Sequence, residues 1–200
     1  VTKLNGNDVK FFYDVNSESR AAIQRSKVRL PNAFKIEDFD TTSTISWALE
    51  KCSEKKERFC WRMARKGDLE LLQFLHERGC PWDTLTCSYA AQNGHLECLK
   101  FAHENGCPWN EGTCLSAAFK GRLECLKYAH ENGCPWDETT CSNAAKFGHL
   151  ECLKYAHENG CPWDETTCFN AAYNDHPESF KYAVENGCPQ STNTEYNVWA

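Results

Sequence analysis

The sequence has little that would suit the chain to a membrane or to a nucleic acid. No apolar run in its 200 residues approaches the roughly 18 that a helix needs to cross a bilayer. Positive charge is also scarce, because the net charge is −6 and residues 60–200 carry only 11 basic against 19 acidic side chains. No basic stripe stands out that could neutralise phosphates. We therefore expect neither a membrane span nor nucleic-acid binding.

Catalytic signatures are lacking as well. The chain has no nucleophile elbow, P-loop, His-Glu-x-x-His motif or paired carboxylates, so we expect no enzyme and no cofactor. No secretory signal is visible, and the first residue is Val1 rather than Met. We expect an intracellular, cytoplasmic protein, with an organelle left open because the N-terminus could have been trimmed.

What the chain does have is a repeat of 27 residues. Seventeen letters, CLKYAHENGCPWDETTC, run from Cys125 to Cys141 and again from Cys152 to Cys168. Gly-Cys-Pro recurs with its cysteine at Cys80, Cys107, Cys134, Cys161 and Cys188. A second cysteine column has the same period: Cys60, Cys87, Cys114, Cys141 and Cys168. A fixed period of 20–50 residues is typical of a solenoid.

Each unit is predicted to be a pair of short helices. Residues 137–148 begin with Asp137, a good N-cap, and end at Gly148, which can adopt the left-handed conformation that stops a helix. Residues 150–157 carry apolar residues on one face, and Pro162 blocks continuation. One hairpin is too small to bury its own apolar face, so we expect it to be buried against neighbouring units.

The stretch TTCSNAAKFGHLECLKYAHENGCPWDE, residues 139–165, resembles the ankyrin repeat. Ala144-Ala145, Gly148-His149-Leu150-Glu151 and Gly160 match in register, while Cys141, Cys161 and Trp163 take the Leu, Ala and Val positions of the family pattern. The resemblance covers roughly residues 56–190 in five copies. Two features depart from the family: Thr-Pro is replaced, and the unit is six residues shorter than the usual ~33. Together with its shorter unit, the resemblance implies an ankyrin-repeat variant with reduced β-hairpin fingers, of the type abundant in algae and giant viruses.

The fourteen cysteines raise the question of metal or disulfides. His130-x3-Cys134 and its counterparts could form half of a zinc site. However, the Cys125 column reads Leu71 and Ser179 in sister copies, and the His130 column reads Val184, so packing is the favoured interpretation. Disulfides are not expected, because an intracellular scaffold keeps its thiols reduced.

Two other columns are interpreted as structural. The indoles of Trp82, Trp109, Trp136 and Trp163 are predicted to cover the seams between units, the alternative being an exposed stripe for a partner. His95 and His149 match the family motif, and their column reads Asp68 and Arg122 in other copies, so no imidazole is required there.

The ends of the chain give weaker signals. Residues 1–55 are predicted to form a helical extension with a degenerate capping unit at residues 44–51, and the N-terminal start faintly resembles an F-box-type adaptor. Residues 56–190 form the five repeats, and residues 191–200 form a polar tail.

The fold expected is therefore an all-α solenoid of five ankyrin-like helical hairpins with an N-terminal helical cap. The family resemblance implies a scaffold that binds another protein or peptide on a concave groove, with membership of a larger complex left open. The alternatives are a metal-binding or thiol protein and a substrate adaptor of a ubiquitin ligase. The proposed binding residues are the most variable pair of columns, which follow Ala-Ala: Arg65, Lys66, Gln92, Asn93, Phe119, Lys120, Lys146, Phe147, Tyr173 and Asn174.

Overall fold

The computed structural model describes residues 57–190, which form ten α-helices and no strand. The helices are α4 (Glu57–Lys66), α5 (Leu69–Glu77), α6 (Thr84–Asn93), α7 (Leu96–Glu104), α8 (Glu111–Phe119), α9 (Leu123–Glu131), α10 (Glu138–Lys146), α11 (Leu150–Glu158), α12 (Glu165–Tyr173) and α13 (Pro177–Glu185). The expected N-terminal cap, the F-box-like start and the polar tail lie outside the described residues.

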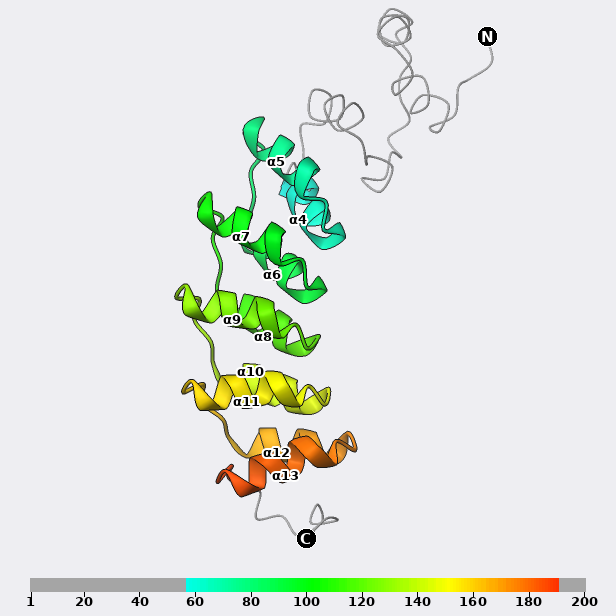
Figure 1. Cartoon of the computed structure of the whole chain (residues 1–200), viewed down its shortest axis with the longest axis vertical. Helices are drawn as coiled ribbons and strands as arrows, with labels where there is room; N and C mark the ends of the chain where they lie inside the picture. Colours follow the sequence, from blue (N-terminus) through cyan, green and yellow to red (C-terminus); the bar gives the residue numbers. More distant parts are fainter. Residues whose placement is uncertain (1–56, 191–200) are drawn as a thin grey trace, which may run out of the picture.

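The helices pair into five hairpins that follow one another along the long axis of the molecule, from α4/α5 to α12/α13 (Figure 1). The first helices of adjacent hairpins pack closely together, whereas the second helices touch one another much less. This arrangement confirms the predicted all-α solenoid of five repeats between residues 57 and 190.

Local capping explains why each hairpin begins and ends where it does. The Asp137 carboxylate accepts a hydrogen bond from the Thr139 backbone N–H at 3.1 Å, as an N-cap does. Helix α10 then ends at Lys146, and Gly148 follows with a φ of 68°, the left-handed conformation that the sequence predicted. The second helix, α11, carries an ion pair between Lys154 and Glu151 at 3.0 Å on its exposed face.

The core is built from small residues. Cys141, Ala144 and Ala145 of α10 and Leu153 and Ala156 of α11 are fully buried, and the equivalent positions are buried in the first three repeats. In the last repeat Ala172 and Phe180 are half-buried. Small side chains let the first helices approach closely, so a ladder of thiols and methyl groups runs through the stack. The first repeat has bulkier groups at two of these positions, with Met63 in place of Ala144 and Leu75 in place of Ala156.

A second set of contacts ties each hairpin to the one before it. The ring of His95 hydrogen-bonds through Nε2 to the Arg65 carbonyl at 3.1 Å, 30 residues upstream. At the equivalent place Arg122 donates from Nε to the Gln92 carbonyl at 3.5 Å. An imidazole and a guanidinium thus make the same link, which explains why that column accepts either.

Candidate binding surface

The ten proposed binding residues lie at the C-terminal ends of the five first helices. Six are exposed, namely Arg65, Lys66, Lys120, Lys146, Phe147 and Tyr173, and the other four are half-buried. Two of the aromatic rings stand out, because Tyr173 is 72% and Phe147 is 37% exposed. The residues therefore share one edge of the stack, where a partner could reach them.

Phe119 and Phe147 form one group rather than two separate anchors. Their ring centroids are 4.4 Å apart with planes at 75°, an edge-to-face contact that joins α8 to the end of α10. Lys120 lies 4.8 Å from the centre of the Phe119 ring, and Lys146 lies 5.6 Å from the centre of Phe147. Two aromatic faces and two ammonium groups thus form a compact patch, the Phe119/Phe147 patch.

The first repeat contributes a second aromatic group that the sequence analysis missed. The rings of Trp61 and Tyr89 lie 5.0 Å apart across α4 and α6, and Arg65 lies 5.8 Å from the centre of the Tyr89 ring. Tyr89 precedes Asn93 by four residues, so it occupies the same helix face one turn earlier. That spacing was the signal that could have found it.

The last repeat contributes a third group. The Tyr173 ring stacks on Phe169 at a centroid distance of 5.5 Å and an angle of 19°. Phe169 also precedes its neighbour by one helical turn, and the sequence analysis missed it for the same reason.

Two of the polar residues in these columns hydrogen-bond to the backbone of their own helices. The side-chain amides of Asn93 and Asn174 donate to the Tyr89 and Asn170 carbonyls at 2.9 and 2.8 Å. These two asparagines therefore fasten helix ends, and we retain them as members of the surface with a structural role.

Positive charge gathers on this edge of an otherwise acidic stack. The two columns hold four cations and no carboxylate among the ten positions. Nearby, burial lowers the pKa of His149, a hydrogen bond to the Phe119 backbone opposes this effect, and the cations facing the ring lower the pKa further. Those cations are Arg122 and Lys120, and the neighbouring His176 ring has the same effect on the pKa of His149.

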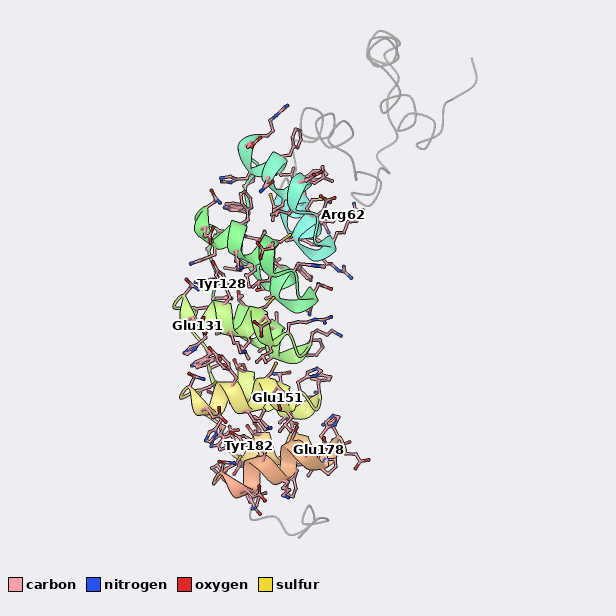
Figure 2. All side chains as sticks on the ribbon, in the orientation of Figure 1. Arg62, Tyr128, Glu131, Glu151, Glu178 and Tyr182 are labelled. Atoms are coloured by element: carbon pink, nitrogen blue, oxygen red, sulfur yellow. The ribbon has the colours of Figure 1, made fainter. Side chains whose placement is uncertain are left out.

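The tryptophans lie at the seams, on the side of the stack formed by the second helices and loops. Trp136 stacks on His130 with centroids 3.8 Å apart, and it meets Tyr155 of the next repeat edge-on at 6.3 Å. The Tyr155 hydroxyl hydrogen-bonds to His130 Nδ1 at 3.0 Å. All four seam tryptophans pack against the core, and Figure 2 labels Tyr128 and Tyr182 at two of these seams. The seam interpretation is therefore confirmed.

The histidine and cysteine of each presumed zinc half-site have different partners. The His130 ring contacts Trp136 and Tyr155, whereas the Cys134 thiol donates to the Asn110 carbonyl at 3.2 Å. The Cys114 thiol lies 4.0 Å from the Cys134 carbonyl. Between residues 57 and 190, no group of three or more His, Cys, Asp or Glu side chains could hold a metal ion.

The cysteines fall into two kinds. No disulfide joins any of the thirteen between residues 57 and 190, and all of them are buried. Burial raises the pKa of the second-helix thiols, to about 11 for Cys98 and Cys125 and about 12 for Cys152. The remaining ten belong to the two complete columns.

Comparisons with known proteins agree with this geometry. Residues 141–184 match the family model described as ankyrin repeats (many copies). The crystal structure of the human ASB11 ankyrin repeat domain superposes with a TM-score of 0.57 at 22% identity, over 64% of this chain and 69% of that chain. No curated protein sequence matches. No helix in the described part of the chain is both long and apolar enough to span a membrane.

The structure is thus an all-α repeat solenoid. More narrowly, the stack shares the fold of an ankyrin repeat domain, and residues 141–184 match the ankyrin-repeat family model. Ankyrin repeats generally mediate protein–protein interaction and are typically non-enzymatic. The algal or giant-virus type stays a prediction.

Proposed function

We propose that the chain is a protein-interaction scaffold that binds a protein or peptide partner along the C-terminal ends of its first helices. Because the first helices pack more closely than the second helices, a stack of such hairpins curves toward them, which favours the concave side for this edge. In this proposal the chain acts inside the cell as a binding protein rather than an enzyme, and joins a larger complex through its partner.

The observation that carries the proposal is the Phe119/Phe147 patch. The two aromatic rings are held edge to face at 4.4 Å, with Phe147 exposed and Phe119 half-buried. Aromatic side chains are favoured anchors of protein interfaces because they bury a large area at a low cost in conformational entropy. Because the two rings already restrict each other, binding should cost little additional side-chain conformational entropy.

Charge indicates the chemistry of the partner. Lys120 and Lys146 flank the rings, and Arg65 and Lys66 extend the positive edge at the first repeat. The rest of the stack is acidic, so an acidic segment would be attracted to this edge and repelled elsewhere. The proposed partner therefore presents carboxylates beside an apolar or aromatic residue.

The test uses a phage-displayed library of random peptides, selected on the full chain and then titrated as free peptides. Changing Phe119→Ala together with Phe147→Ala should weaken a selected peptide by about 2 kcal/mol or more, which is roughly thirtyfold. The melting midpoint should fall only slightly, because the change removes one aromatic pair worth ~0.5–1.5 kcal/mol.

The matched control changes Glu97→Ala and Lys100→Ala, an exposed ion pair of 3.0 Å on the second helix α7. It removes two side chains without net charge change, and peptide affinity should stay the same. Equal binding by the phenylalanine variant would refute the proposed surface. A collapsed melt of that variant would instead place the two rings in the core, and the surface assignment would fail with it.

A further inference from the structure

The two complete cysteine columns differ from the third in a way that packing does not explain. The Cys125 column on the second helices reads Leu71, Cys98, Cys125, Cys152 and Ser179, so that buried position accepts three residue types. The Cys114 column and the Cys134 column are cysteine in all five repeats. If volume alone decided these positions, they would vary as the neighbouring column does.

The members of the two complete columns form pairs, each joining residue i to residue i+20 within one repeat. In three repeats the first-helix Sγ lies 3.9–4.0 Å from the carbonyl oxygen of its partner, and in all five repeats the neighbouring loop thiol raises the pKa of the first-helix thiol. The pairs are Cys60–Cys80, Cys87–Cys107, Cys114–Cys134, Cys141–Cys161 and Cys168–Cys188.

The surroundings of a pair contain polar groups and carboxylates, because Asp83 acts on Cys60 and Glu111 on Cys134, and each raises the pKa of the thiol. The Thr113 hydroxyl lowers the pKa of the Cys134 thiol, and the equivalent hydroxyls of Thr86, Thr140 and Thr167 are buried with no hydrogen-bond partner within residues 57–190. Every paired cysteine is at most 5% exposed. Two thiolates around a monovalent soft metal ion would leave a net negative charge in this dry site, whereas a disulfide is neutral.

The two thiols of a pair are not equivalent. Hydrogen bonding to Cys114 lowers the pKa of Cys134, whereas the same contact and burial raise the pKa of Cys114 strongly. The loop cysteine is also the slightly more exposed member, 3% for Cys134 against 0% for Cys114. The loop thiol is thus the member that a reagent would reach first.

We propose that each repeat contains an oxidisable dithiol, and that a low-molecular-weight disulfide such as oxidised glutathione converts the i/i+20 pairs to disulfides within the folded stack. The loop thiolate attacks one sulfur of the reagent and forms a mixed disulfide, releasing one glutathione thiolate. The first-helix thiolate then attacks the protein sulfur and releases the second glutathione. One protein S–S bond forms, the reagent S–S bond breaks, and the two thiol protons end on the two glutathione molecules.

The sequence allows a direct readout by trypsin after oxidation and blocking of the remaining thiols. Oxidation of all five pairs would link six tryptic peptides into one chain, because each of the four middle peptides carries members of two neighbouring pairs. They are residues 59–62, 79–100, 101–120, 128–146, 155–181 and 182–200. The unpaired Cys125 and Cys152 lie on separate peptides, 123–127 and 147–154, and should carry the alkylating reagent.

The experiment exposes the reduced full chain, with chelator and without oxygen, to graded ratios of oxidised to reduced glutathione, and follows helicity in the same samples. Links 101–120 to 128–146 and 128–146 to 155–181 with helicity retained support the proposal. The variant Cys114→Ser should lose the first link alone, and the matched control Cys125→Ser should keep every link.

Three results would overturn the proposal. The first is that the folded chain forms no link under conditions in which the urea-unfolded chain oxidises. The second is a Cys134–Cys141 bond inside peptide 128–146, or a link to the Cys125 or Cys152 peptide. The third is that links form only as helicity is lost, which would mean that the unfolded chain reacts.

Discussion

Replacing Trp136 by alanine tests whether the aromatic seams hold the repeats together. The half-buried indole lies in the loop between α9 and α10, where it stacks on His130 at 3.8 Å and meets Tyr155 at 6.3 Å. Truncating a fully buried tryptophan costs ~3–5 kcal/mol, so half burial suggests about 2 kcal/mol. Two ring contacts add roughly 0.5 kcal/mol each or more, which gives about 3 kcal/mol in all.

The assay is urea unfolding followed by far-ultraviolet circular dichroism, which reports helix in every repeat. Because each repeat contacts only its neighbours, weakening one seam should lower the midpoint and also broaden the transition, as the segments on either side unfold less cooperatively. Trp163→Ala should behave alike, since Trp163 stacks on His157 at 3.7 Å in the same geometry. Phe147→Ala serves as a control that removes a surface ring.

A midpoint of Trp136→Ala equal to that of the parent would refute the reasoning. It would mean that the ring contacts form without contributing to the coupling between repeats, and the tryptophan column would then be available as a binding stripe.

Three further outcomes follow from the geometry. Cys114→Ala should lower the free energy of unfolding by roughly 1–2 kcal/mol through a small cavity, and a chelator should leave the parent's melting midpoint unchanged. Gly121→Ala should destabilise by more than the ~1 kcal/mol of a left-handed alanine, because the added Cβ would lie 2.5 Å from His149 Nδ1, and thermal melting measures the loss. Folding lowers the pKa of His149, so its neutral ring contributes to the stability of the fold at pH values above the unfolded-state pKa. This stability is lost as the pH falls from the unfolded-state pKa through the folded-state pKa. Melts between pH 7.5 and 5.5 should show a falling midpoint, less so in His149→Gln.

Much of the fold could be predicted because its signals are local. The N-cap of α10 depends on Asp137 and the next two residues, and the stop depends on Gly148, so a reader needs no tertiary information. The 27-residue period then supplies the tertiary arrangement, because identical units stack in identical ways. The buried core could be predicted from the same pattern, because the small side chains of Ala144 and Ala145 allow neighbouring helices to pack closely.

The candidate site was harder, because its contacts join residues whose separation is not a multiple of the period. Phe119 and Phe147 meet 28 residues apart, and His130 bonds Tyr155 at a separation of 25. Both depend on the rotation between successive hairpins, which the sequence pattern does not reveal. The cysteine pairs depend on how each hairpin folds back, so the columns were visible while their contact was not.

The repeated seventeen letters allow one whole repeat to be removed without a new junction. Deleting residues 125–151 joins Glu124 to Cys152. The seventeen residues that then follow Glu124 are identical to the seventeen that follow it in the parent chain. Helix α8 would then face α12, and the seam would be that of His157, Trp163 and Tyr182. The shortened chain should keep its helical content per residue but melt at a lower midpoint, because one interface is lost. It should also lose the aromatic patch, since Asn174 would take the place of Phe147 beside Phe119. Circular dichroism and peptide titration measure both effects. An unfolded product would show that stability depends on the order of particular repeats, and the view of interchangeable seams would be wrong.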